Sequence, residues 1–422
     1  MQERLEAHEE SSEPPGRSSE ARDGEWYDWR WQFRNRVRCA EDLARHARVT
    51  PEMAQAIEAC SREFRFAVTP YYLSLIDWSD PNDPIRRQAI PNAEELEDPL
   101  GGTDPLQEED HSPVKGLVHL YPDRVAFLVT ADCAIYCRHC TRKRFVGKGG
   151  KMTAEDVDRA IEYIRQTPQI RDVLVTGGDP LVASDAWLES LISRIRAIAH
   201  VEIIRIGTRM PVTMPQRITP ELCNMLQKYH PIWVNTHFNH PRELTAEAAA
   251  AVDRLLRAGI PVGNQTVLLK GVNDDPEVMR QLVQGLLKMR VRPYYLYQCD
   301  LLRGTAHFRT PIETGLEIIS SLQGWTTGFG VPTYVVDTPI GKIPVMPQNL
   351  VERGDGYVVL RNFQGRTIRL PNPSPEGATL PEQVTPVTPA PPDAAHSNGR
   401  TNGTYSNGKA HRTPPVRGGH HE

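Results

Sequence analysis

The stretch "RVAFLVTADCAIYCRHC", residues 124–140, joins an apolar strand-like run to three closely spaced cysteines. Residues 124–130 carry the β-branched and apolar side chains that a buried strand requires. Cys133, Cys137 and Cys140 then follow with the spacing C-x3-C-x2-C. Three thiolates cannot complete a tetrahedral metal site, so the motif needs a fourth ligand or a metal centre with an open position.

Strand-like and helical patterns alternate along the middle of the chain. Each apolar run is followed by a segment in which apolar residues recur every three to four positions, as in an amphipathic helix. Six such units imply a parallel sheet with right-handed crossovers, either doubly wound or curled into a full or partial barrel. The predicted strands are residues 124–130, 172–178, 201–208, 231–238, 261–269 and 292–298.

Chemically active residue types follow these strands directly. The cysteine loop comes after the first strand, Gly177, Gly178 and Asp179 come after or at the end of the second, and Asp300 comes after the sixth. In parallel α/β folds, functional residues gather at the carboxyl ends of the strands. We therefore expect these loops to form one site.

Charge is nearly balanced over the 422 residues, with 49 Lys and Arg against 53 Asp and Glu. This balance gives no electrostatic reason to expect nucleic acid or a membrane as a partner. No run approaches 18 consecutive apolar residues, and the first residues lack the basic and apolar regions of a signal peptide. Seven scattered cysteines argue against a disulfide scaffold, so we expect a cytoplasmic protein.

Composition divides the chain into five segments. Both ends are polar and have few large apolar side chains to offset the entropy of ordering, so we expect them to be disordered. The predicted segments are a tail at 1–24, a helical N-terminal extension at 25–115, the α/β core at 116–325, a C-terminal segment with a hairpin at 326–370, and a Pro/Ser/Asn/Gly-rich tail at 371–422.

The cysteine spacing directly after the first strand resembles the signature of the radical S-adenosylmethionine superfamily. The resemblance implies an α/β fold with a partial (β/α)6 barrel. It also implies a [4Fe–4S] cluster on Cys133, Cys137 and Cys140, whose open fourth iron binds S-adenosylmethionine. A zinc site or a purely structural cysteine cluster is the alternative. The residues that the resemblance assigns to S-adenosylmethionine are His139, Gly177, Gly178 and Asp179.

Longer blocks narrow the resemblance to one family. The blocks "TPYYLSLIDWSDPNDPIRRQAIP" (69–91), "IRIGTRMPVTMPQRITPEL" (204–222) and "RPYYLYQCDLLRGTAHFRTPI" (292–312) look like the lysine 2,3-aminomutase family. The resemblance implies an isomerase that interconverts L-lysine and L-β-lysine by 1,2-amino migration, with pyridoxal 5′-phosphate as a further cofactor. An aminomutase acting on arginine or ornithine, or a non-catalytic iron–sulfur relative, remains an alternative.

The resemblance places pyridoxal phosphate on Lys342, in "TPIGKIPVMP", as a Schiff base. A Schiff base requires an amine that can lose its proton, and burial in a cramped loop would lower the pKa of this lysine. Pro339 is followed by only Ile340 and Gly341, where the family has a run of glycines. We therefore expect a shorter and stiffer loop.

The resemblance also assigns the substrate contacts. Arg142 matches the residue that pairs with the α-carboxylate, which a guanidinium can bind with two parallel hydrogen bonds. Asp300 and Asp337 match the carboxylates that hold the ε-ammonium, and such a pair favours lysine over glutamate because two buried like charges need a cation between them. The other basic residues of the loop are expected to meet the acidic N-terminal region or solvent, and these are Arg138, Lys143, Arg144 and Lys148.

Partners are expected from the same resemblance. They are a small amino-acid substrate, lysine, and an electron donor such as flavodoxin or ferredoxin. A homo-oligomer is also expected, and neither nucleic acid nor a membrane is. Some members of the family have an additional zinc site built from late cysteines, but no cysteine follows Cys299 here, so no additional zinc site is expected.

Overall fold

The computed structural model describes residues 24–372, and the tails predicted at 1–24 and 371–422 lie outside these residues except at their inner ends. Nine strands form one sheet, in which spatial order follows chain order. Strands β2 to β8 are parallel, whereas β1 and β9 pair antiparallel at the two edges, so the barrel is open. The strands are β1 Leu117–Tyr121, β2 Arg124–Thr130, β3 Asp172–Gly177, β4 Ile203–Gly207, β5 Ile232–Thr236, β6 Val262–Leu268, β7 Arg292–Gln298, β8 Thr333–Val336 and β9 Ile343–Pro344.

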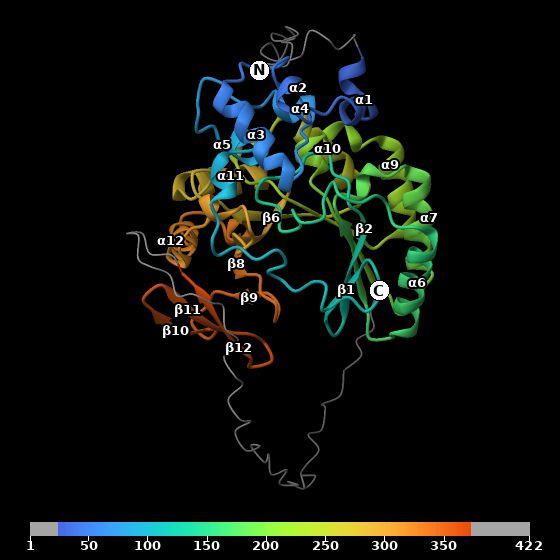
Figure 1. Ribbon diagram of the computed structural model, residues 1–422. Helices are drawn as coiled ribbons and strands as arrows, with labels where there is room; N and C mark the ends of the chain where they lie inside the picture. Colours follow the sequence, from blue (N-terminus) through green and yellow to red (C-terminus); the bar gives the residue numbers. More distant parts are fainter. Residues whose placement is uncertain (1–23, 373–422) are drawn as a thin grey trace, which may run out of the picture. The chain divides into compact units, whose positions relative to one another are not determined.

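A helix follows each of the six predicted strands, which confirms the strand–helix alternation. Thr153 accepts a hydrogen bond from the backbone N–H of Asp156 at the start of α6, and Thr219 caps α9 in the same way. Figure 1 shows α6, α7 and α9 side by side along the strands. The helices of this region are α6 Ala154–Gln166, α7 Asp185–Arg196, α8 Met210–Thr213, α9 Pro220–Leu226, α10 Ala246–Arg257, α11 Pro276–Lys288 and α12 Ile312–Leu322.

The C-terminal part adds strands to the sheet and a second small sheet. The strand-like residues 332–338 contain β8, which joins the main sheet as a seventh parallel strand beside β7. The hairpin predicted at 356–370 is present as β11 and β12, and β10 is a third strand that the sequence did not predict. The second sheet consists of β10 Leu350–Gly354, β11 Tyr357–Arg361 and β12 Thr367–Pro371.

The N-terminal extension is helical, as predicted, and lies at one end of the sheet in Figure 1. It packs on the cysteine loop, because the backbone N–H of Tyr136 donates to the carbonyl of Ala67 and that of Arg138 donates to the carbonyl of Gln88. Every described residue belongs to one compact unit, and the division of the chain into segments stays a prediction. The helices of the extension are α1 Trp29–Arg34, α2 Ala40–Leu43, α3 Pro51–Glu63, α4 Pro70–Leu73 and α5 Pro84–Ala89.

Short 3-10 turns connect many of these elements. They are η1 Glu25–Tyr27, η2 Ala93–Leu96, η3 Pro180–Val182, η4 Pro215–Arg217, η5 Gln227–Tyr229, η6 Pro241–Glu243, η7 Ala306–Phe308 and η8 Gly328–Gly330. Within residues 24–372, no helix has both the length and the apolar character needed to cross a membrane.

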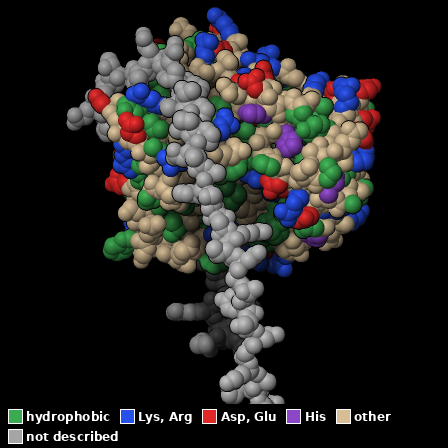
Figure 2. Space-filling view, turned by 90° about the horizontal axis from the view of Figure 1, so that it is seen from below, with side chains coloured by type: hydrophobic (Ala, Val, Ile, Leu, Met, Phe, Trp, Pro, Cys, Tyr) green, Lys and Arg blue, Asp and Glu red, His purple; other side chains and the backbone are tan. Residues whose placement is uncertain are grey.

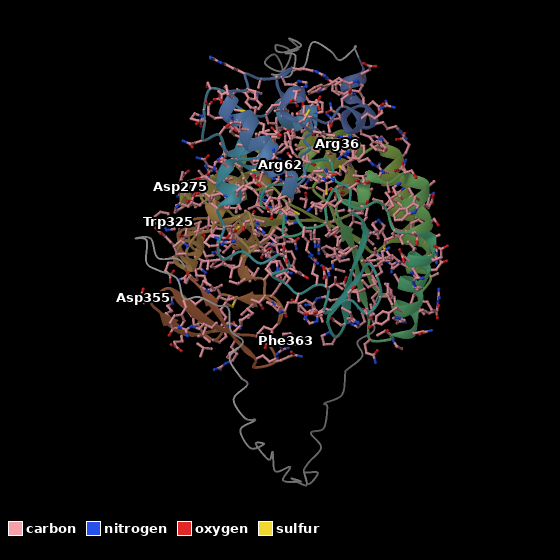
Figure 3. All side chains as sticks on the ribbon, in the orientation of Figure 1. Arg36, Arg62, Asp275, Trp325, Asp355 and Phe363 are labelled. Carbon is pink, nitrogen blue, oxygen red and sulfur yellow. The ribbon has the colours of Figure 1, made fainter. Side chains whose placement is uncertain are left out.

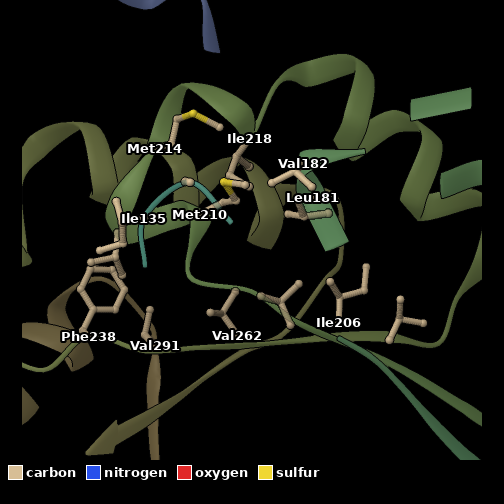
Figure 4. Close-up of a cluster of buried hydrophobic side chains, with 14 of the residues drawn as sticks. Ile135, Leu181, Val182, Ile206, Met210, Met214, Ile218, Phe238, Val262 and Val291 are labelled. Carbon is tan, nitrogen blue, oxygen red and sulfur yellow. The ribbon is translucent and has the colours of Figure 1, made fainter. Parts of the chain in front are cut away.

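One large apolar core lies between the sheet and its helices. Figure 4 shows part of this core, with Met210 and Ile218 facing the strand residues Ile206 and Val262. Ile135, between the first two loop cysteines, is 3% exposed and belongs to the same core. Burial of this side chain therefore anchors the cysteine loop to the barrel.

Candidate active site

A cavity of about 630 Å³ lies inside the open barrel. Its volume is typical of ligand sites, which are roughly 300–1,000 Å³. All three loop cysteines and Lys342 line it. The other predicted site residues line it too, and these are His139, Arg142, Gly177, Gly178, Asp179, Asp300 and Asp337. The fold thus brings every predicted site residue to one cavity.

The three cysteine side chains are free thiols at the carboxyl end of β2. Burial raises the pKa of Cys140 to about 11 and the pKa of Cys133 well above its usual value. Three buried thiolates therefore require a strongly cationic centre, and a cluster held by three cysteines fits this donor set. Among residues 24–372, no three His, Cys, Asp or Glu side chains are grouped closely enough to hold a single metal ion.

Arg209, directly after β4, contacts the cysteine loop from inside the barrel. Its Nη1 lies 2.9 Å from the Sγ of Cys137, and its Nη2 lies 2.7 Å from Oε1 of Glu243 and 2.6 Å from Oε1 of Gln88. Glu243 is fully buried and Arg209 is 8% exposed. The guanidinium is therefore a fixed positive charge beside a predicted cluster ligand.

Gly177 and Gly178 let the end of β3 pass directly against the cysteine loop. A Cβ on Gly178 would lie 2.4 Å from the carbonyl oxygen of Asp132, and one on Gly177 would lie 2.5 Å from that of Thr130. Gly177 also has a φ of +123°, which disfavours other residues. The glycines thus set the distance between β3 and the loop, in addition to the cofactor contact predicted for them.

Asp179 ties β3 to β4. Its carboxylate accepts hydrogen bonds from the Thr208 hydroxyl and from the backbone N–H of Arg209, each at 2.8 Å. Burial raises the pKa of Asp179 to about 6. The carboxylate therefore positions Arg209, and the contact with S-adenosylmethionine stays a prediction.

His139 is 9% exposed and packs edge-on against Phe308, with 6.3 Å between ring centroids. Its Nε2 lies 3.3 Å from Nδ2 of Asn239, and its buried Nδ1 has no hydrogen-bond partner among the described residues. Burial holds the pKa of His139 well below its usual value. A neutral ring with a free buried nitrogen fits a ligand in the cavity, and the contact of His139 with S-adenosylmethionine stays a prediction.

Lys342 begins the turn into β9, and its ammonium is paired. Its Nζ lies 2.8 Å from Oδ2 and 3.1 Å from Oδ1 of Asp337. The sequence predicted that burial would lower the pKa of this lysine, and that prediction is wrong. Burial does lower it, but the carboxylate of Asp337 outweighs burial and raises the pKa of Lys342 above its usual value.

The loop before Lys342 is a tight turn, as its length predicted. Gly341 has a φ of +107°, and its N–H donates to the carbonyl of Thr338 at 2.9 Å. The backbone N–H of Lys342 donates to the hydroxyl of Tyr121 at 2.6 Å. Tyr121 in turn stacks on Phe363, labelled in Figure 3 at the turn of the small sheet. The backbone of Lys342 is therefore held by β1, and Phe363 of the small sheet packs on the tyrosine that holds it.

Arg142 is held by a glutamate that the sequence analysis missed. Its Nη2 lies 2.7 Å and its Nε 3.1 Å from Oε1 of Glu108, which lies near the end of the extension, shortly before β1. Glu108 and Arg142 are 9% and 18% exposed. Within residues 24–372, Glu108 accepts from Nε and Nη2 of Arg142 and no side chain or carbonyl accepts from Nη1, so Nη1 is left for a ligand.

Asp300 and Asp337 line the same part of the cavity as Lys342. Burial, and next the nearby charge of Asp337, raise the pKa of Asp300 to about 7. A cation between the two carboxylates would remove this repulsion. In the absence of a ligand, the ammonium of Lys342 supplies part of that positive charge.

The remaining basic residues of the loop mostly meet the acidic N-terminal region, as predicted. Glu95 accepts hydrogen bonds from Arg138 at 2.5 and 2.8 Å and from Nζ of Lys143 at 2.7 Å, and all three side chains are at most 3% exposed. Arg144 pairs with Asp104 at 3.1 Å. Glu95 carries the local signal of a capping box with Asn92, but the basic partners of Glu95 and Glu108 have no local signal, because each pair meets only in the fold.

Comparisons with known proteins agree with this site. A model of the radical SAM superfamily matches residues 127–283, and a model described as lysine-2,3-aminomutase matches residues 319–399. An L-lysine 2,3-aminomutase from Clostridium subterminale is 56% identical over 347 residues, which are 81% of this chain and 83% of that protein. A glutamate 2,3-aminomutase from Clostridioides difficile is 47% identical over 349 residues, 82% of this chain and 83% of that protein.

A third relative, from another genus, is also a lysine 2,3-aminomutase. The L-lysine 2,3-aminomutase from Bacillus subtilis is 48% identical over 352 residues, which are 82% of this chain and 75% of that protein. Relatives at this identity, aligned over more than two thirds of the chain, identify its family. With the cysteine loop, Lys342 and the shared cavity in place, the chain belongs to the lysine 2,3-aminomutase family of the radical S-adenosylmethionine superfamily.

Proposed function

We propose that this protein is an isomerase that interconverts L-lysine and L-β-lysine by moving the amino group from C2 to C3. The observation that carries the proposal is the single cavity lined by three thiols, by Lys342 and by a cation and two carboxylates suited to the ends of lysine. The curated lysine enzymes support it, and they do not favour arginine or ornithine as the substrate. Glutamate would place a third carboxylate beside Asp300 and Asp337, which like-charge repulsion disfavours.

The family relationship implies three cofactors: a [4Fe–4S] cluster, S-adenosylmethionine and pyridoxal 5′-phosphate. Cys133, Cys137 and Cys140 would hold the cluster, and Lys342 would bind pyridoxal phosphate through its amine. Residues His139, Gly177, Gly178 and Asp179 would border S-adenosylmethionine. When bound, these groups supply a carbon radical that removes a hydrogen atom from the substrate and an electron sink for the migrating nitrogen.

The side chains of the chain bind and orient the substrate. The free Nη1 of Arg142 would hold the α-carboxylate, and Asp300 with Asp337 would hold the ε-ammonium, so C2 and C3 lie at a fixed place between them. Asp337 has a second role, because its Oδ2 holds a proton of the Lys342 ammonium. Binding of the substrate ammonium would replace that contact.

The proposal extends to partners and location. A one-electron donor such as flavodoxin or ferredoxin would reduce the cluster, and the chain would act as a homo-oligomer. A reducing compartment, the cytoplasm, would keep the three thiols available for the cluster.

The proposal is tested by anaerobic incubation of reconstituted protein with S-adenosylmethionine, pyridoxal phosphate, dithionite and ¹³C-labelled L-lysine, followed by NMR. We expect β-lysine, and we expect Cys137→Ser and Lys342→Ala each to abolish it. Cys223→Ser, a buried cysteine outside the cavity, is the matched control and should remain active. No β-lysine from protein with a full complement of iron and pyridoxal phosphate would refute the proposal.

A further inference from the structure

We propose that the N-terminal extension carries the docking surface for a small acidic protein that delivers single electrons to the cluster. This inference rests on the proposed function, which requires an electron at Cys133, Cys137 and Cys140. The side chains of these cysteines face the cavity, where the substrate and S-adenosylmethionine would lie. An electron carrier must therefore reach the cysteine loop from the opposite side, and the extension covers that side.

Arg36 marks the contact between the extension and the back of the loop. Its Nη1 donates a hydrogen bond to the carbonyl oxygen of Cys133, and its Nε donates to the carbonyl of Phe33 at 3.0 Å. The guanidinium carbon of Arg36 lies 3.7 Å from the centroid of the Phe33 ring. Figure 3 labels Arg36 among the helices of the extension. One buried side chain therefore links the extension to the backbone of a predicted cluster ligand.

A groove of about 240 Å³ opens beside Arg36. We call it the basic groove, because Arg34, Arg36, Arg38 and Arg45 all line it. Arg34, Arg38 and Arg45 are exposed to solvent, whereas Arg36 forms the inner wall. Asp42 is the acidic residue of the lining, and it lies 3.8 Å from Arg45. Three exposed cations therefore surround the entrance, with one carboxylate to oppose them.

The local charge is opposite to that of the chain. Residues 29–48 contain six arginines and two acidic residues, whereas the whole chain has a net charge of −4. Figure 2 shows the face at the other end of the molecule, where basic and acidic side chains are interspersed. A positive region on a negative chain directs an acidic partner to one place, and this orientation is what electron transfer to a buried centre needs.

The test compares two reductants on the same cluster. Stopped-flow absorbance measures reduction of the reconstituted protein by reduced flavodoxin, an acidic carrier, and by dithionite, which needs no docking surface. The test variant is Arg34→Glu/Arg38→Glu/Arg45→Glu. The matched control is Arg165→Glu/Arg257→Glu/Arg290→Glu, whose side chains are 54%, 77% and 63% exposed and lie far along the chain from the extension.

We expect the test variant to be reduced by flavodoxin at least about tenfold more slowly at low ionic strength, because steering by charge is lost. Its reduction by dithionite and its dithionite-driven lysine isomerisation should match those of the unmodified protein. The control variant should keep the flavodoxin rate. In the unmodified protein, that rate should fall as salt is added.

Four results would overturn the inference. One is an unchanged rate of cluster reduction by flavodoxin in the test variant. Another is an equal fall in the rate of reduction by dithionite, which would mean damage to the cluster itself. The third is a flavodoxin rate that does not depend on salt in the unmodified protein, a result that needs no variant to fold. A short DNA duplex that blocks reduction as well as excess oxidised flavodoxin does would also contradict it, since the groove would then attract any polyanion. Failure of dithionite to reduce the unmodified protein would instead refute the proposed function.

Discussion

Two glutamates from the N-terminal region hold four basic residues of the cysteine loop, but they do so in different surroundings. Glu95 binds Arg138 and Lys143 where all three side chains are at most 3% exposed and away from the cavity. Glu108 binds Arg142 and lies near Arg144 at the cavity wall, where the arginines are each 18% exposed. The first group can only support the loop, whereas the second can also meet a ligand. Burial, more than residue type, separates the two roles.

The largest effect on stability is expected when Glu95, the centre of the buried ion pairs, loses its charge. Glu95→Gln leaves Arg138 and Lys143 without their counter-charge, and breaking a buried pair costs about 3–5 kcal/mol. We expect a large fall in the free energy of unfolding and poor cluster loading, measured by denaturant titration and iron content. Glu97→Gln, two residues away and exposed, is the control and should change neither. A loss below about 1 kcal/mol, typical of surface ion pairs, would contradict the structural role.

Acid titration tests whether the charge of Glu95, and not merely an uncharged contact, stabilises the fold. Burial alone would raise the pKa of Glu95, but Arg138 and Lys143 outweigh it and hold the pKa at about 2, below the usual 4.5. A lowered pKa means that the stabilisation is complete above pH 4.5 and is lost as the pH falls toward 2. The stability difference between the unmodified protein and Glu95→Gln should therefore shrink over this range. A difference that is independent of pH would show that charge is not its source.

The next prediction concerns Gly178, where the end of β3 lies directly against the cysteine loop. Gly178→Ala would place a Cβ 2.4 Å from the carbonyl oxygen of Asp132, so the loop must move. Such overpacking typically costs about 1–3 kcal/mol. We expect lower iron content after reconstitution, measured by metal analysis and by the EPR spectrum of the reduced cluster. Gly150→Ala, where nothing lies within 4 Å of the new Cβ, should load normally.

Removing the charge of Glu108 at the cavity wall should change the binding of lysine more than the stability of the fold. Glu108→Gln removes the charge that orients Arg142, and we expect the KM for lysine to rise about tenfold, equivalent to about 1.4 kcal/mol, with a smaller change in kcat. Glu109→Gln, a neighbouring side chain that is 79% exposed, is the control. If Glu108→Gln lowers stability as much as Glu95→Gln and leaves KM unchanged, the distinction between the two glutamates is wrong.

The smallest expected effect is a shift in the pH dependence of pyridoxal phosphate binding. Asp337 raises the pKa of Lys342, so pyridoxal phosphate should bind faster as the pH rises and the amine loses its proton. Asp337→Asn should move this pH profile to lower pH by about 1 unit or more, followed as the absorbance of the bound cofactor. A profile that stays in place would mean that the ion pair does not control the amine.

The sequence predicted the repeating and local features of this molecule. The six strand–helix units and the tight turn before Lys342 depend on neighbouring residues, and all are present. The pairing of Lys342 with Asp337 was not predicted, and it reversed the expected direction of the pKa shift. A five-residue separation in a loop gives no periodic signal, so only the folded turn brings the two charges together.

Contacts between distant segments could not be predicted for the same reason. Glu95 and Glu108 are 43 and 34 residues from Arg138 and Arg142. The capping box of Asn92 and Glu95 marks a local turn, and it does not indicate these distant partners. Arg209 likewise reaches Cys137 over 72 residues. Such partners are chosen by the geometry of the barrel and the extension, and one sequence records only that suitable charges are present.

The account is tested most directly by offering the reconstituted protein a mixture of equal amounts of ¹³C-labelled L-lysine, L-arginine, L-ornithine and L-glutamate. The measurement is anaerobic NMR of all four amino acids and their β-isomers. Arg142 with Asp300 and Asp337 predicts that only β-lysine accumulates at an appreciable rate. Conversion of glutamate at a comparable rate, or of none of the four while S-adenosylmethionine is cleaved, would contradict the assignment of this cavity to lysine.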